Sequence, residues 1–347
     1  MTQHRTVTLK DIAREAGVSL MTVSRALRKH ASVSPETQTK IERVANALGY
    51  RPNPLISALM SYRRAGKAPH SHSVLAFVTS FPTRDGWKTR KIYQEFFQGA
   101  LECADRHGYR LEEFWLRENG MNAQRLSHIL YSRNINGIIV APLPVSVGHL
   151  SLDWEKFSAV TFSYTLARPI LHRASNHQFR SMRMVMRQLR RLGYTRIGLA
   201  MPASCDHRVD DQWTASFLME QQRVSGGKTI PLCVIDDKDW NEASFRAWFV
   251  KNRPDVVISQ QAKILEWLQT MNKRVPHDVG FVHLNCPDQS GKIAGIYQNS
   301  QMIGRVAVDF LVGMIQRNER DVPSLPHTIL VEGTWIDGET VKKASAS

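Results

Sequence analysis

The sequence predicts a small all-α module at the N-terminus followed by an α/β core in two lobes, with parallel sheets covered by helices on both faces. Three observations predict this architecture. Residues 7–51 contain three closely spaced amphipathic helical patterns. From residue 74 onward, short apolar strands alternate with amphipathic helices. The chain is 347 residues long, so a module of about 60 residues leaves room for two further domains.

The first helical pattern begins just after Thr8. Apolar residues recur at i, i+3, i+4 and i+7 and form one stripe. The stripe consists of Leu9, Ile12, Ala13 and Ala16. Thr8 with Asp11 three positions later is a workable N-cap pair, and Gly17 supplies a sharp turn after the helix.

Two further helices follow the turn. Ser19 can cap a second helix from Leu20 to about Leu27, and Ser34 caps a third helix, with Pro35 at its first position. The inner face of the third helix is formed by Ile41, Val44, Ala45 and Leu48. Two short helices joined by a glycine turn are typical of the helix-turn-helix, whose second helix lies in the DNA major groove. The alternative is a three-helix structural module that binds no nucleic acid.

The distribution of charge favours the nucleic-acid interpretation. The chain has 46 Lys and Arg against 31 Asp and Glu, which gives a net charge of +15. Residues 1–65 hold 11 of the basic side chains and 4 of the acidic ones. Binding of such a basic segment to DNA is favoured because condensed counterions are released from the phosphates.

Residues 7–53 resemble the DNA-binding headpiece of LacI/GalR-type transcription regulators, down to residues 47–53, which read Ala-Leu-Gly-Tyr-Arg-Pro-Asn. Looser similarity continues in the core, for example at residues 136–140 and 192–198. The resemblance implies an effector-binding core similar to periplasmic sugar-binding proteins, in which the chain crosses between the lobes three times. It implies domains at 1–51 (headpiece), 52–73 (hinge and linker) and 74–347 (effector binding and dimerisation).

In this family the second helix meets base edges with residues that match Leu20, Met21 and Arg25. Arg25 could hold guanine O6 and N7, a contact worth about 1–3 kcal/mol of discrimination. Leu20 and Met21 are suited to thymine methyl groups, and their alternative role is to pack against the third helix. The expected phosphate contacts are Ser19, Thr22 and Ser24.

The linker contains a short amphipathic piece from Leu55 to about Tyr62. In the resembled family this piece is a hinge helix that inserts a leucine into the minor groove, and Leu59 occupies the matching position. Ile56 and Met60 stand where relatives usually have alanine, so the sequence does not determine how closely two paired hinge helices approach each other. His70 and His72 are interpreted as solvated linker residues because no third metal ligand is near.

The resemblance, with its three crossings, implies a first lobe of about 74–174 plus 294–323 and a second of about 175–293 plus 324–340. The predicted strands are 74–79, 110–115, 137–140, 159–162, 196–200, 230–235, 256–259 and 279–282. The predicted helices are 93–107, 123–132, 179–192, 209–222, 243–252 and 262–271. The arginines of residues 179–192 lie opposite an apolar stripe and are interpreted as a solvated surface.

Ligands in open α/β folds bind beyond the carboxyl ends of strands. The candidate effector residues, partly implied by the resemblance, are Phe81, Trp87, Tyr93, Asn176, Arg208, Trp240 and Asn285. Asn176 and Asn285 stand where relatives usually have Asp, which weakens the case for an ordinary sugar effector because Asn is a neutral acceptor. For each aromatic residue, packing in the core is an equal alternative.

Other classes of site find no support in the sequence. The four cysteines are far apart and lack CxxC spacing, so we expect reduced thiols and neither disulfides nor a zinc site. Catalytic motifs, a cofactor site, a signal segment and a membrane span are not expected either. The sequence therefore predicts a cytoplasmic, dimeric regulator of a pseudo-palindromic operator, most simply a repressor controlled by a sugar-like small molecule. The alternatives are an activator or effector-independent regulator, and a sugar-binding or sugar-processing protein on a related fold.

Overall fold

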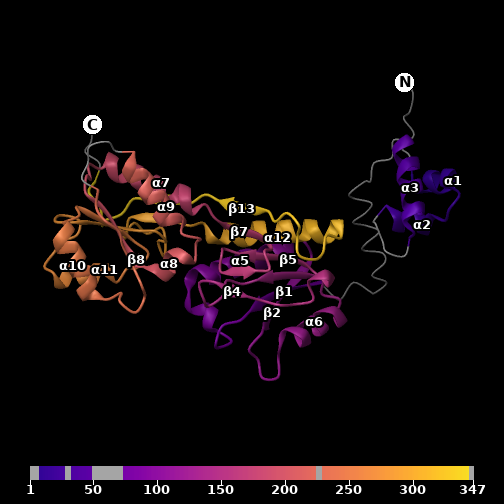
Figure 1. Ribbon diagram of the computed structural model, residues 1–347, viewed down its shortest axis with the longest axis horizontal. Coiled ribbons are helices and arrows are strands. Elements are labelled where there is room, and N and C mark those ends of the chain that lie inside the picture. The colour runs from indigo at the N-terminus through magenta and orange to yellow at the C-terminus, as the bar shows by residue number, and fades with distance from the viewer. Residues whose placement is uncertain (1–7, 28–32, 49–72, 224–228, 344–347) are drawn as a thin grey trace. The chain divides into compact units, whose positions relative to one another are not determined.

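The computed structural model of the chain describes residues 8–27, 33–48, 73–223 and 229–343. These residues belong to two compact units, which we describe separately. The small unit contains the three N-terminal helices, and the large unit contains all the strands that the structure describes (Figure 1). The predicted hinge and linker, including Leu59, Ile56, Met60 and the two linker histidines, lies outside the described residues apart from Ser73.

The small unit contains the predicted helices α1 (Leu9–Ala16), α2 (Leu20–Ala26) and α3 (Pro35–Ala47). At the start of α1, the Asp11 carboxylate accepts hydrogen bonds from the Thr8 backbone N–H at 2.9 Å and from the Thr8 hydroxyl at 2.7 Å. Gly17 ends the helix with φ of 63°, a left-handed conformation that glycine adopts without steric cost.

The core of the small unit is formed by the inward faces of all three helices. The buried side chains are Ile12, Ala16, Val23, Ala26, Ile41 and Ala45. The predicted stripe residues Leu9, Ala13, Val44 and Leu48 are partly buried and pack around them. The serine caps Ser19 and Ser34 accept hydrogen bonds from Thr22 N–H and Thr37 N–H, as the sequence predicts.

The first lobe of the large unit contains a six-stranded parallel sheet in the order β13-β7-β5-β3-β1-β2. Its strands are β1 (Ser73–Thr79), β2 (Tyr109–Trp115), β3 (Gly137–Val140), β5 (Ser158–Phe162), β7 (His172–Asn176) and β13 (Thr328–Val331). Two short strands between β3 and β7 along the chain, β4 (Gly148–His149) and β6 (Leu166–Arg168), form a separate parallel pair.

The second lobe contains a six-stranded sheet in the order β14-β12-β11-β10-β8-β9, parallel except for the β12–β14 pair. Its strands are β8 (Ile197–Pro202), β9 (Cys233–Ile235), β10 (Val256–Ser259), β11 (Gly280–His283), β12 (Gly295–Tyr297) and β14 (Thr334–Ile336). Parallel strands require crossover connections, which accounts for the helices between them.

Helices pack against the two sheets, as strand–helix alternation predicts (Figure 1). The α-helices are α5 (Lys91–Arg106), α6 (Ala123–Ser132), α7 (Gln178–Arg191), α8 (Ala203–His207), α9 (Gln212–Gln222), α10 (Glu242–Asn252), α11 (Ile264–Thr270) and α12 (Ser300–Arg317). Two short 3₁₀ helices are η1 (Gly86–Thr89) and η2 (Trp154–Lys156). Within the described ranges, no helix combines the length and the apolar character needed to cross a membrane.

The strand order shows that the chain passes between the two lobes three times. It passes after β7, after β12, and between β13 and β14. The predicted lobe boundaries are therefore wrong at two strands. β12 lies in the second sheet, although 294–323 was assigned to the first lobe, and β13 lies in the first sheet, although 324–340 was assigned to the second. Both strands have three or four residues, and periodicity does not reveal which distant strand a short segment pairs with.

Candidate nucleic-acid interface and ligand cleft

The outward face of α2 is apolar at its start and cationic one turn later. Leu20 is 42% exposed and Met21 is 57% exposed, and Arg25 is also exposed. Val23 and Ala26 occupy the opposite face and are fully buried against the other helices. The two large apolar side chains are therefore not part of the three-helix core, which contradicts the alternative that they pack against α3.

The polar residues predicted near phosphates cluster at the start of α2. The Ser19 hydroxyl accepts a hydrogen bond from the Thr22 backbone N–H at 3.0 Å, and the hydroxyls of Ser19 and Thr22 lie 2.8 Å apart. Ser24 is half-buried on the same helix. The structure thus places all six headpiece candidates on α2 or at its cap.

In the large unit, Arg208 connects the two lobes. It follows α8 of the second lobe, and its guanidinium donates hydrogen bonds to Leu143 O at 2.8 Å and Pro144 O at 3.2 Å, in the loop after β3 of the first lobe. Its Nη2 also donates to the Tyr93 hydroxyl on α5 at 2.5 Å. Three acceptors of the first lobe therefore hold one cation of the second.

Phe81 belongs to the same group, because its ring lies 6.0 Å from that of Tyr93 in an edge-to-face arrangement. Of the seven candidate effector residues, the structure thus brings Phe81, Tyr93 and Arg208 together. Further contacts between the lobes come from Ser146 Oγ, which donates to Ser204 O at 3.3 Å, and from the Lys91 ammonium, which donates to Pro287 O. Most of these acceptors are backbone carbonyls, which have no signature in the sequence.

Trp87 and Trp240 pack against other aromatic residues of their own lobes. Trp87 is 2% exposed, its ring lies 5.4 Å from that of Phe77, and its indole N–H donates to Glu113 Oε1 at 2.9 Å. Trp240 is half-buried, with its ring 5.4 Å from that of Trp267. For these two residues the core-packing alternative agrees with the structure.

The two asparagines occupy different environments. Asn176 is 2% exposed at the end of β7, where the chain leaves the first lobe, and its side-chain amide donates to Gln298 O beside the second crossing. Asn285 is half-buried, and its backbone N–H donates to His283 Nδ1 at 3.0 Å. Burial lowers the pKa of His283 to about 4, so this histidine is a neutral acceptor at pH 7.

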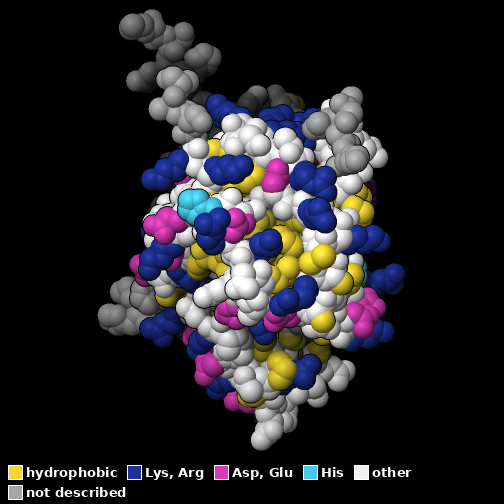
Figure 2. Space-filling view, turned by 90° about the vertical axis from the view of Figure 1, so that its left-hand side faces the viewer, with side chains coloured by type: hydrophobic (Ala, Val, Ile, Leu, Met, Phe, Trp, Pro, Cys, Tyr) yellow, Lys and Arg dark blue, Asp and Glu magenta, His cyan; other side chains and the backbone are white. Residues whose placement is uncertain are grey.

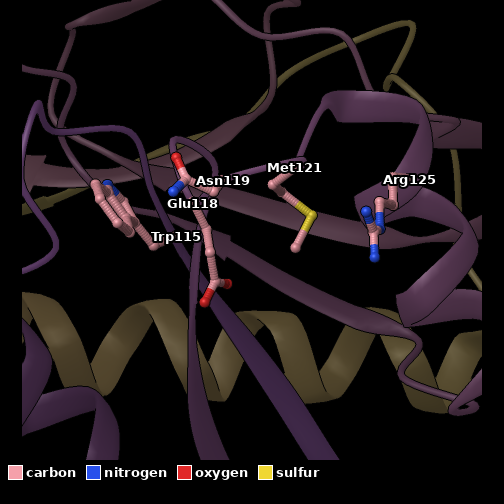
Figure 3. A pocket seen from close by; sticks show the side chains of 5 residues that line it. All are labelled: Trp115, Glu118, Asn119, Met121 and Arg125. Carbon is pink, nitrogen blue, oxygen red and sulfur yellow. The ribbon is translucent and has the colours of Figure 1, made fainter.

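A cavity of about 530 Å³ lies at the carboxyl end of β2 (Figure 3). Its lining residues are Trp115, Glu118, Asn119, Met121 and Arg125. The Trp115 indole N–H donates to Phe81 O at 2.8 Å, and the Arg125 guanidinium donates to Gly120 O at 2.9 Å. The lining comes from the end of β2, the loop after it and the first turn of α6, and the sequence did not indicate that these three segments enclose a cavity.

Three of the five arginines of α7 are paired with carboxylates. Arg180 lies 2.9 Å from Glu332, and Arg183 and Arg190 lie 3.1 and 2.9 Å from Glu220. Figure 2 shows Lys and Arg side chains interspersed with Asp and Glu over the end of the large unit that carries α10 and α11. These ion pairs agree with a solvated surface and give no reason to place a second nucleic-acid site on α7.

Comparisons with known proteins show which families this chain is similar to. Residues 8–53 match the family described as "Bacterial regulatory proteins, lacI family", and residues 186–341 match the family described as "Periplasmic binding protein-like domain". The HTH-type transcriptional regulator GalS of Salmonella typhimurium is 26% identical over 210 residues, covering 59% of this chain and 56% of GalS. That alignment therefore spans little more than half of the relative.

Two further comparisons cover nearly the whole chain. The ribose operon repressor of Bacillus subtilis is 23% identical over 97% of this chain and 99% of its own. The structure of the lac repressor dimer bound to operator and the anti-inducer ONPF has a TM-score of 0.55 at 18% identity, covering 97% of this chain and 99% of that one. This likeness shows that the two chains share a fold.

Proposed function

We propose that the chain is a sequence-specific DNA-binding transcription regulator of the lacI type, because residues 8–53 match the lacI family of bacterial regulatory proteins and residues 186–341 match the periplasmic binding protein-like domain. In this proposal the operator affinity is set by a small molecule bound between the two lobes. The observation that carries the proposal is the exposed face of α2, on which Leu20, Met21 and Arg25 stand clear of the three-helix core.

This face has the chemistry of direct base readout. A guanidinium can donate two parallel hydrogen bonds to guanine O6 and N7, and exposed aliphatic side chains suit the methyl group of thymine. Ser19, Thr22 and Ser24 are proposed to contact phosphates and to fix the position of α2 in the groove. Leu59 is proposed as the minor-groove wedge of the hinge.

The sign of regulation and the ligand class are inferred from relatives. The ribose operon repressor and the lac repressor are both named as repressors, which favours repression here. We propose a sugar-like effector that contacts Phe81, Tyr93 and Arg208, because these residues meet between the lobes. Replacement of two expected carboxylates by Asn176 and Asn285 favours a ligand that needs fewer charge-assisted acceptors.

A cytoplasmic homodimer completes the proposal. One headpiece reads only a half-site, so a pseudo-palindromic operator requires two. The second candidate function, an activator or effector-independent regulator, differs in whether a ligand shifts the equilibrium between DNA-bound and released states. No observation favours a sugar-processing enzyme over these two.

Selection of binding sites from random duplexes, using the purified full chain, tests the main proposal. We expect enrichment of a single pseudo-palindromic motif with G·C pairs at the positions that Arg25 reads. Recovery of unenriched sequence at moderate salt would contradict it. A thermal-shift screen against sugars and sugar phosphates then separates the two regulator types, since a bound effector must raise the melting temperature.

A further inference from the structure

Three side chains that can bind metal converge where α5 packs against α12 in the first lobe. Cys103 lies in the last turn of α5, His107 is the C-cap residue of that helix four positions later, and Asp309 projects from α12. Cys103 Sγ lies 3.2 Å from Asp309 Oδ1, and His107 Nε2 lies 2.7 Å from the same oxygen. One potential ligand atom from each residue lies within 4.8 Å of the other two.

Glycine allows the two helices to approach closely enough for this contact. A Cβ atom on Gly99 of α5 would lie 1.9 Å from Gln301 O of α12, and one on Gly304 of α12 would lie 2.1 Å from Phe96 O of α5. Gly99 and Cys103 lie on the same face of α5, one turn apart. The backbones are therefore in contact beside the cluster, which fixes the position of Asp309 relative to the two ligands on α5.

We propose that Cys103, His107 and Asp309 bind a divalent transition-metal ion of the zinc class. Thiolate, imidazole and carboxylate are the ligands that zinc takes in proteins, and the i, i+4 spacing on one helix is a common way to present two of them. Three protein ligands leave the fourth tetrahedral position for water. Cys103 is fully buried, whereas the side chains of His107 and Asp309 are 36% and 57% exposed, so an ion can enter from the solvent side.

The surroundings indicate how the ion would be held. Burial, the hydrogen bond to Asp309 and its negative charge raise the pKa of the Cys103 thiol to about 11, against the opposing effect of nearby Arg106. Without metal the thiol is therefore protonated at pH 7, and binding must release this proton and replace the two short contacts to Asp309 Oδ1 with metal bonds. The bound ion would join α5 to α12 and stabilise the first lobe.

Cobalt substitution tests this site directly. The full chain is treated with a chelator and titrated with Co²⁺, which reports a thiolate ligand by a near-ultraviolet charge-transfer band. We expect one Co²⁺ per chain with this band, its loss on addition of Zn²⁺, and a higher melting temperature with Zn²⁺ than without.

Variants assign the ligands. C103S should abolish the band, while C286S, which removes another buried thiol, should retain it. H107Q and D309N should weaken binding by about 10-fold or more, since they replace an imidazole and a carboxylate with neutral amides, which are poorer zinc ligands. These two side chains lie at the exposed rim, so the variants keep the test valid if C103S does not fold.

A cobalt complex without a thiolate band, or a band that survives C103S, would overturn the proposal. The site contains no residue of the small unit, so its outcome is independent of whether the chain binds an operator. The sequence alone predicted no metal site because Asp309 is 202 positions from His107 and the cysteines lack paired spacing.

Discussion

Arg25 is the side chain on which specificity is expected to depend most. It lies one turn after Met21 on the exposed face of α2, at the distance from the helix start where base edges are reached. A guanidinium held against guanine discriminates between bases, whereas one held against a phosphate adds only general affinity. The two roles therefore predict different effects of the same substitution.

We expect Arg25→Ala to weaken binding to the selected operator by about 1–3 kcal/mol while changing binding to random duplex much less. Arg14→Ala is the matched control, because Arg14 is an exposed cation of the same unit that pairs with Asp11 at 3.4 Å. Titrations of both duplexes at one salt concentration measure the difference. An equal loss on operator and random DNA would reassign Arg25 to a phosphate.

At the scale of elements, the packing of α7 against α9 depends on a buried carboxylate. The Glu220 side chain is 2% exposed and accepts hydrogen bonds from Arg183 and Arg190 of α7, with Arg223 3.3 Å away. Burial alone would raise the pKa of this carboxyl, but the hydrogen bonds from Arg190 and Arg183 outweigh it and hold the pKa below its usual value.

Glu220→Gln should destabilise the large unit by about 3 kcal/mol, the lower end of the range for a broken buried ion pair, because the arginines remain half-exposed. A depressed carboxyl pKa stabilises the fold at pH values above the unfolded pKa of about 4.3, and this contribution disappears as pH falls below it. The difference between wild type and variant should therefore shrink from pH 7 to pH 3 in urea titrations. Glu242→Gln, at an exposed pair with Arg246, should change stability much less than Glu220→Gln at every pH.

The elements also show what local sequence can and cannot predict. The helices of the small unit were predicted closely because caps such as Ser34 and turns such as Gly17 are local signals. β7, β12, β13 and β14 were not predicted, since they are short and their alternation is weak. Their place depends on pairing with strands many residues away, which a window of residues does not contain.

The contacts of the candidate ligand site were also beyond local sequence, because they join distant segments. The sequence indicated Tyr93 and Arg208 separately, and the resemblance suggested that both face ligand, but the hydrogen bond between them exists only after the two lobes meet. The carbonyl oxygens of Leu143 and Pro144 could not be predicted, because every residue has one. Trp87 has an aromatic ring that could stack on a ligand, but it is buried in the core. The sequence does not distinguish a ligand-stacking tryptophan from a core tryptophan, because the difference lies in the burial of the site.

At the scale of the large unit, Arg208 holds the lobes together through acceptors on the first lobe. Each hydrogen bond from a charged donor is worth about 1.5–3 kcal/mol, so Arg208→Ala should shift the lobes toward an open arrangement. Small-angle scattering should show a larger radius of gyration without a change in secondary structure. Ser146→Ala removes only the 3.3 Å contact to Ser204 O and should leave the curve unchanged. Identical curves for wild type and Arg208→Ala would show that other contacts determine closure.

The spacing of half-sites tests the proposed assembly of two chains on one operator. If each subunit places one α2 in a major groove, both helices must meet the same face of the duplex. The half-sites must then be separated by whole turns of the duplex, each about 10.5 base pairs. Inserting five base pairs at the centre of the selected operator rotates one half-site to the opposite face, and binding should fall to the level of a single half-site. Inserting ten restores the face but lengthens the span by about 34 Å, so recovery measures how far the segments joining each headpiece to the core can extend. If the chain bound the operator with five inserted base pairs as tightly as the original operator, each headpiece would bind its half-site independently. A ligand between the lobes could then not control DNA binding through the distance between two headpieces.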